Sequence, residues 1–240
     1  MKEIEFNNII EKYSQKINIE LQENQKKMLY QYMNILLEWN KRINLTAIVE
    51  ENEIILKHFI DSLTIEKYIK QDDEVIDIGT GAGFPGIPLK ILNNSIKLTL
   101  LDSVNKKINF LEQVKKELKL QNVECIHSRA EQYIIENNKK ETYDIGVSRA
   151  VASLNTLVEY ILPYIKINGI CICMKGPNIQ EELKEAEKAI NVLGGKIEKI
   201  EEITLPYSDI KRNIIIIRKE KNTPKEYPRK AGKPKENPIK

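Results

Sequence analysis

A glycine-rich segment directly after an apolar run carries the clearest chemistry in this sequence. It spans residues 75–86, with glycines at 79, 81, 83 and 86 and Pro85 at the expected start of a helix. Glycine is needed there because a β-carbon would block both the close approach of a ligand and the positive φ of a tight turn. A strand, a glycine turn and a helix start in this order are typical of a nucleotide-cofactor site. Gly79 and Gly81 are therefore candidate cofactor contacts.

Two acids flank this turn and bear on which cofactor it holds. Asp77 lies just before Gly79, and Asp102 ends the next apolar run. Read from Gly81, Gly-x-Gly-x-x-Gly followed by an acid about twenty residues on matches the dinucleotide fingerprint. An Asp77 carboxylate that faces the turn argues against a pyrophosphate, because like charges about 4 Å apart repel by roughly 4 kcal/mol near a surface. It suits S-adenosylmethionine, which carries a sulfonium and an ammonium, while Asp102 suits ribose hydroxyls in either case.

Loops after later apolar runs add further candidates. Carboxyl ends of parallel strands meet at one edge of a sheet, so Ala130 and Glu131, after the third run, are expected at the adenine edge. Arg149 and Lys175 follow the fourth and fifth runs. They are expected to clamp a base or its phosphates, although Arg149 suits a cofactor carboxylate equally well.

Metal and cysteine chemistry is not indicated. The three cysteines show no Cys-x-x-Cys spacing and there are only two histidines, so we expect no metal site. His58 lies three residues before Asp61 in a helical pattern, a spacing that lets the two side chains meet on one face. We expect this pair to tie N-terminal helices to the main domain, with RNA contact as the alternative.

An alternation of strands and helices must position these residues. Short β-branched runs predict strands at 74–78, 97–101, 123–126, 143–147, 170–174, 197–204 and 213–217. Helices fill most gaps, which predicts a parallel sheet, but the last two strands are joined by only residues 205–212 and must be antiparallel. Apolar residues at helical spacing predict two helices within residues 1–40 and a third over 51–67.

The expected fold class is therefore α/β and Rossmann-like, of the S-adenosylmethionine-dependent methyltransferase type. Its sheet has seven mostly parallel strands with an antiparallel last strand. We expect an N-terminal helical cap at 1–70, the Rossmann-like methyltransferase domain at 71–218 and a basic, proline-rich tail at 219–240. No apolar run approaches the roughly 18 residues of a membrane span, which favours a cytoplasmic protein without membrane contact.

The tail concentrates positive charge. Residues 218–240 hold nine Lys or Arg against three Glu, whereas the whole chain has a net charge of only +3. With four prolines and no apolar periodicity, the tail is expected to be extended or disordered by itself. It is either a solubilising tail or an arm that binds RNA phosphates, with Arg229 and Lys230 as contacts.

Several motifs together resemble the bacterial small-subunit ribosomal RNA methyltransferase G family, also called glucose-inhibited division protein B. The similarity covers nearly the whole chain. The motifs are Trp39-Asn40, Asn44-Leu45-Thr46, residues 58–63, the turn 77–88, Leu101-Asp102-Ser103, Ser148-Arg149-Ala150, Ser153-Leu154, Lys175-Gly176 and residues 227–232.

The resemblance implies transfer of a methyl group from S-adenosylmethionine to N7 of a guanine in the 530 loop of 16S rRNA. The partner would be 16S rRNA, in the small ribosomal subunit or its precursor, and the enzyme a monomer. The family's cofactor contacts fall on Gly79, Phe84, Ala130, Glu131 and Arg149. Phe84 stands where many relatives have leucine, as an apolar wall.

Guanine N7 carries a lone pair and no proton, so this reaction requires no catalytic base, and Arg149 and Lys175 act by positioning. Two alternatives stay open at this point. The literal glycine pattern allows an NAD(P)-dependent oxidoreductase, and the basic tail allows a non-catalytic rRNA-binding factor of ribosome assembly.

Overall fold

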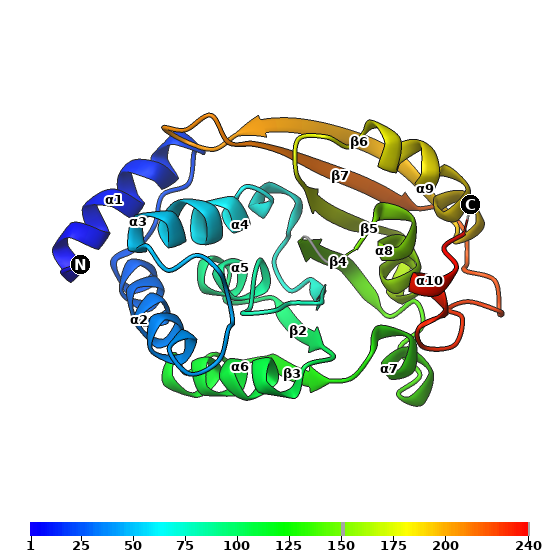
Figure 1. Cartoon of the computed structure of the whole chain (residues 1–240), viewed down its shortest axis with the longest axis horizontal. Coiled ribbons are helices and arrows are strands. Elements are labelled where there is room, and N and C mark those ends of the chain that lie inside the picture. The colour runs from blue at the N-terminus through cyan, green and yellow to red at the C-terminus, as the bar shows by residue number, and fades with distance from the viewer. Residues whose placement is uncertain (150–151, 240) are drawn as a thin grey trace.

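The structure is a computed structural model that describes residues 1–149 and 152–239. Within these residues one sheet has the strand order β3-β2-β1-β4-β5-β7-β6 (Figure 1). Its strands are β1 Glu74–Ile78, β2 Lys97–Asp102, β3 Val123–His127, β4 Tyr143–Arg149, β5 Ile165–Lys175, β6 Gly195–Thr204 and β7 Lys211–Lys219. Strands β1 to β5 are parallel, and β7 is antiparallel to both β5 and β6. The predicted fold class is confirmed, including the antiparallel last strand.

Helices cover both faces of the sheet, which is why most strands read as unbroken apolar runs. Alternate strand residues enter two different cores: Val75 of β1 packs with α5 and α6, and its neighbour Ile76 packs with α7, α8 and α9. These helices are α5 Gly86–Leu92, α6 Asn105–Glu117, α7 Ala130–Glu136, α8 Leu154–Ile161 and α9 Gln180–Val192. A short 3-10 turn, η3 Leu162–Tyr164, leads from α8 into β5.

The N-terminal helices share a core with the sheet. They are α1 Glu3–Lys16, α2 Glu23–Asn40, α3 Glu51–Ile54, the π-helical turn η1 Ile55–Ile60, α4 Asp61–Leu63 and the 3-10 turn η2 Glu66–Tyr68. Phe6, Leu29 and Phe59 from these helices lie in the same buried cluster as Val75. Residues 1–70 therefore share their core with the sheet. The helix predicted over 51–67 is interrupted, and consists of α3, the π turn η1, α4 and the 3-10 turn η2.

Tyr32 of α2 fastens these helices to the glycine turn. Its hydroxyl donates a hydrogen bond to the Ala82 carbonyl, and its ring lies 5.4 Å from the Phe84 ring. A β-carbon on Gly83, whose φ is +92°, would lie 2.6 Å from the Tyr32 hydroxyl oxygen. Gly83 is therefore required both by its backbone conformation and by the close approach of α2.

The described residues of the C-terminal tail are folded onto the domain. It contains a short helix, α10 Lys233–Glu236, beside α8 (Figure 1). Thr223, Pro234 and Ile239 are buried, and Ile239 belongs to the core cluster that includes α8 and α9. Among the described residues, no helix is both long and apolar enough to cross a membrane.

Candidate functional site

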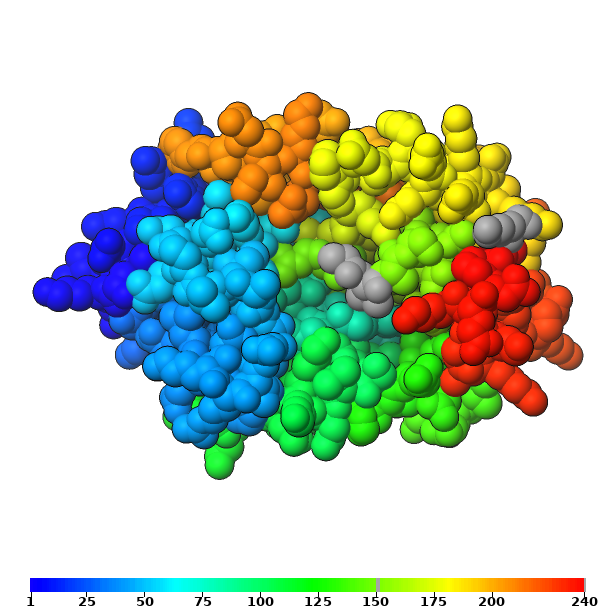
Figure 2. Space-filling model, viewed as in Figure 1, coloured from blue at the N-terminus to red at the C-terminus, as the bar shows by residue number. Residues whose placement is uncertain are grey.

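A cavity of about 760 Å³ opens at the carboxyl edge of β1 to β4. Figure 2 shows a depression on this face, with the N-terminal helices (blue and cyan) on one side and the tail (red) on the other. The volume is within the range of small-molecule sites, roughly 300 to 1,000 Å³. Its walls come from the turn after β1, the ends of β2 and β4, the starts of α6 and α7, helix α8 with the residues before it, the N-terminal region and the tail.

The glycine turn forms the floor of this cavity. Gly79 and Gly81 both have positive φ, +67° and +62°, as their residue type predicts. The Gly79 amide donates to the Leu101 carbonyl over 2.8 Å, and the Gly81 amide donates to Asp102 Oδ2 over 2.9 Å. The turn is therefore held against the end of β2, with both glycines lining the cavity.

Asp102 lies at the end of β2, where the sequence places it, and lines the cavity. Besides Gly81, it accepts a hydrogen bond from the Val104 amide at Oδ1 over 2.9 Å, and Lys107 Nζ lies 3.4 Å from Oδ2. Only 5% of Asp102 is exposed. Its carboxylate is thus oriented by backbone donors before any ligand binds.

Asp77 faces the glycine turn, as expected, but it does not line the cavity. It is fully buried beneath the turn, where its Oδ2 accepts hydrogen bonds from the Thr80 hydroxyl and the Gly86 amide over 2.8 and 2.9 Å. Within the described residues its Oδ1 has no hydrogen-bond partner, and burial raises the pKa of the carboxyl to about 7. Asp77 therefore holds the turn and the first residue of α5 in place.

Phe84 lines the cavity as the expected apolar wall. Its ring is stacked on the His58 ring, with centroids 4.4 Å apart and planes 17° apart. The Arg149 guanidinium carbon lies 5.2 Å from the Phe84 centroid. This single side chain therefore contacts the helical region and the cation at the end of β4.

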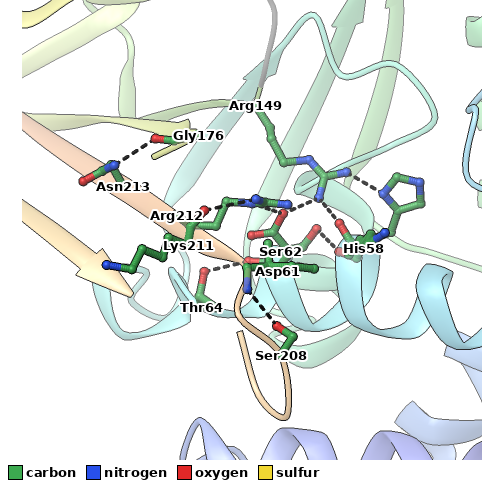
Figure 3. Close-up of polar contacts among 12 residues, drawn as sticks. His58, Asp61, Ser62, Thr64, Arg149, Gly176, Ser208, Lys211, Arg212 and Asn213 are labelled. Carbon is green, nitrogen blue, oxygen red and sulfur yellow. Dashed lines mark hydrogen bonds and ion pairs between the residues drawn. The ribbon is translucent and has the colours of Figure 1, made fainter. Parts of the chain in front are cut away.

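Arg149 is held by three acceptors from the N-terminal helices (Figure 3). Its Nη1 donates to the Lys57 carbonyl over 2.9 Å and to Asp61 Oδ2 over 3.1 Å, and its Nη2 donates to His58 Nδ1 over 3.0 Å. Arg212 of β7 donates from Nε to the same Asp61 Oδ2 over 3.1 Å. His58 and Asp61 thus tie the helices to β4 and β7, as expected.

His58 is a neutral imidazole in this network. Arginine can only donate, so His58 Nδ1 must accept, and the ring proton is on Nε2, which donates to Thr46 Oγ1 over 2.9 Å. Burial, and then the nearby Arg149 charge, lower the pKa of His58 to about 3. His58 therefore orients Arg149 as an acceptor rather than as an acid.

The start of α7 contributes Ala130 and Glu131 to the cavity wall. The Ala130 carbonyl accepts a hydrogen bond from the Tyr164 hydroxyl over 2.5 Å. Glu131 is only 4% exposed, and its Oε1 accepts a hydrogen bond from the Gly232 amide of the tail over 2.9 Å. Both residues occupy the expected edge, and Glu131 has a tail partner that the sequence did not indicate.

Two expected RNA contacts are occupied by internal ion pairs. Lys175 does not line the cavity; its Nζ is 2.8 Å from Glu182 Oε2 and donates to the Ala152 carbonyl. Arg229 donates from Nε and Nη2 to the two oxygens of fully buried Glu159 over 2.8 and 2.6 Å. Lys175 and Arg229 thus have internal partners in this structure, and their contact with RNA stays a prediction.

Two predicted residues remain, the tail cation Lys230 and the motif residue Ala150. Lys230 is exposed. Ala150, the last residue of the motif at the end of β4, lies outside the described residues.

Sequence reasoning missed several residues of the cavity wall. Lys107 could have been found, because it stands in the first turn of the helix after Asp102, at the edge where such sites form. Thr46 stands in a motif of the family resemblance but was not assigned to the site, and the others gave no local signal because their segments come from distant parts of the chain. The missed lining residues are Thr46, Lys107, Thr156, Tyr160, Lys235 and Pro238.

Comparisons with known proteins give one consistent result. The model of the family described as "rRNA small subunit methyltransferase G" matches residues 25–215. The chain is 52% identical to ribosomal RNA small subunit methyltransferase G of Alkaliphilus oremlandii, over 99% of this chain and 100% of that relative. It is 50% identical to the protein of the same name from Clostridium botulinum (strain ATCC 19397 / Type A), with the same coverage.

Among solved structures, a SAM-dependent methyltransferase from Aquifex aeolicus superposes with a TM-score of 0.53 at 18% identity. The match covers 75% of this chain and 97% of that one. At this identity the likeness shows the fold alone.

Proposed function

Because the chain belongs to the rRNA small subunit methyltransferase G family, it is an S-adenosylmethionine-dependent rRNA methyltransferase, and we propose that it methylates N7 of a guanine in the 530 loop of 16S rRNA. The observation that carries the family is identity of about half the residues over nearly the entire chain. The oxidoreductase and the non-catalytic assembly factor have no comparable support.

The cavity offers groups that fit S-adenosylmethionine. Asp102 presents a backbone-oriented carboxylate for the ribose hydroxyls, and Gly79 has no side chain to keep a ligand from the floor. Ala130, Glu131 and Phe84 line the cavity, and we propose that the first two hold the adenine and that Phe84 is the apolar wall. When bound, S-adenosylmethionine supplies a methyl group on a positively charged sulfur.

The chain's own task is to hold a base against this methyl group and to exclude water. Guanine N7 has a lone pair and no proton, so its methylation needs no general base in the cavity. Arg149 is the positioning cation that we propose for the base or the cofactor, because it lines the cavity while His58 and Asp61 fix its guanidinium.

The target base must be accessible. N7 faces the deep, narrow major groove of an A-form duplex, so an unpaired guanine in a loop fits the cavity better than a paired one. We propose that the partner is the small ribosomal subunit or its precursor, that the enzyme acts as a monomer, and that it works in the cytoplasm, where this RNA is found. Lys230 is the predicted phosphate contact that the structure leaves exposed.

Label transfer tests the proposal directly. Purified chain, labelled S-adenosylmethionine and small subunits from cells lacking the enzyme are incubated together, and N7-methylguanosine is mapped along 16S rRNA. The proposal expects one new N7-methylguanosine, in the 530 loop. Label at another position, or no label, contradicts the proposal. In that case, calorimetry with NADH and with S-adenosylhomocysteine separates an oxidoreductase from an inactive binding protein.

A further inference from the structure

The tail is anchored to the domain along its whole described length. Near its start, the Thr223 amide donates to Glu141 Oε1 over 2.7 Å. Lys140 Nζ then donates to the carbonyls of Pro224 and Tyr227 over 3.0 and 3.1 Å. The anchored residues precede, in the sequence, the part of the tail that lines the cavity. The anchors therefore fix where the tail approaches the site.

Arg229 is the strongest of these anchors. It pairs with both oxygens of Glu159, a side chain of α8 that is 0% exposed, and the Arg229 amide donates to Glu159 Oε1 over 3.2 Å. A buried carboxylate without a partner is costly, so undocking the tail would leave Glu159 uncompensated. The folded tail is thus the favoured state of this chain.

The segment after this anchor forms part of the cavity wall. Gly232 has a φ of +88°, which directs its amide to Glu131 Oε1, and Pro234 accepts a hydrogen bond at its carbonyl from Thr156 over 3.2 Å. Lys235 and Pro238 line the cavity beside Glu131 and Thr156. The tail therefore meets the site at the starts of α7 and α8, on the side of β3 and β4.

That side is where the adenosine of the cofactor belongs under the proposed function, on which this inference rests. Asp102 ends β2 and takes the ribose, and Ala130 and Glu131 begin the helix after β3, the neighbouring strand. We propose that the docked tail is the outer wall of the adenosine half of the cofactor site, through Gly232 on Glu131 and through Lys235 and Pro238. Tail docking and cofactor binding then strengthen each other.

The test measures binding of S-adenosylhomocysteine and of adenosine by calorimetry to the full chain and to two variants. One variant ends at Gly232 and so keeps Arg229 while losing both cavity-lining residues. The other is Gly232→Ala, which strains the positive φ and disturbs the amide on Glu131. We expect affinity for both ligands to fall by about fivefold or more in each variant, the effect of losing roughly one contact.

Lys221→Ala is the matched control, because it removes one exposed tail cation that has no place in the cavity wall. Its affinity for both ligands should equal that of the full chain. A second measurement needs no variant: saturating S-adenosylhomocysteine should slow tryptic cleavage within residues 225–235 of the full chain, because the coupling is reciprocal.

Two results overturn the inference alone. These are unchanged affinity in the chain that ends at Gly232, and tail cleavage that is indifferent to S-adenosylhomocysteine. A full-length chain that binds neither ligand contradicts instead the proposed function.

Discussion

Arg149 donates a hydrogen bond from Nη2 to Nδ1 of His58 over 3.0 Å, so a residue at the end of β4 is oriented by the π turn of the N-terminal helices. The π turn ends directly before Asp61, the second partner of Arg149. Extra residues in a helical turn often mark functional segments. Here the turn brings an acceptor and an acid to one guanidinium.

Removing Asp61 should destabilise the protein strongly. Asp61 is 1% exposed and pairs with Arg149 and Arg212, whose side chains are 14% and 23% exposed, so Asp61→Ala leaves two partly buried cations without their anion. We expect the free energy of unfolding in urea to fall by about 3 kcal/mol or more. Glu53→Ala, which breaks a partly exposed pair with Lys57, should cost less than about 1 kcal/mol. Equal losses in the two variants would refute the role of the buried pair.

His58 should remain neutral well into the acid range. Its pKa in the folded protein is about 3, below the ordinary 6.5, so the unfolded chain binds more protons between these values. The stability due to neutral His58 is complete above about pH 6.5 and is lost as the pH falls toward 3. Nitrogen NMR of the imidazole should show a protonated Nε2 and a bare Nδ1 down to about pH 5. A titration midpoint near 6.5 would disprove this.

Asp102 should be essential for cofactor affinity. Asp102→Ala removes the carboxylate from the cavity and leaves the Gly81 and Val104 amides without their acceptor. We expect calorimetry to show S-adenosylhomocysteine binding weaker by about tenfold or more, which corresponds to roughly 1.4 kcal/mol. Asp209→Ala, at an exposed acid outside the cavity wall, is the control and should bind normally.

Asp77 should make stability depend on pH in the opposite sense to His58. Its folded pKa of about 7 lies above the ordinary 3.8, so the folded state binds more protons and loses stability as the pH rises through this interval. Asp77→Asn lacks this proton linkage. We expect the wild type to lose up to roughly 1.4 kcal/mol per pH unit relative to the variant between about pH 4 and 7, in denaturant unfolding. A constant difference would contradict the raised pKa.

Exposed tail lysines should set the salt dependence of RNA binding. Replacing Lys225, Lys230 and Lys233 by alanine removes three cations from the exposed side of the tail. Each contacted phosphate on a single strand contributes about 0.7 to the slope of log affinity against log salt, so the slope should flatten by up to about 2. The same substitutions at Lys116, Lys184 and Lys188 lower the net charge equally and should leave the slope unchanged.

The sheet was predictable because its signals are local. Unbroken apolar runs mark strands covered on both faces, and the eight residues between the sixth and seventh predicted strands leave no room for a crossover. Gly79, Gly81 and Asp102 followed from the turn itself. The alternation of side chains did not reveal that Asp77 points beneath the turn instead of into the cavity, because Thr80 and Gly86 capture it there.

The tail contacts were not predictable for one physical reason, which is that the partners of the tail residues lie far away in the sequence. Arg229 meets Glu159, which is 70 residues away, and Gly232 meets Glu131 across a separation of 101 residues. Such pairs arise only when the chain has folded, so composition suggested a free arm. The π turn was equally invisible, because one added residue barely changes the apolar spacing of a helix.

The contact of Tyr32 with the glycine turn bears on how the protein opens. The Tyr32 hydroxyl on α2 donates a hydrogen bond to the Ala82 carbonyl, and α2 lies so close to Gly83 that a β-carbon on this residue would clash with Tyr32. We therefore expect that helix α2 cannot unfold while strand β1 stays folded, nor the reverse. Their slowest amide hydrogens should exchange through a single global opening, as one cooperative unit.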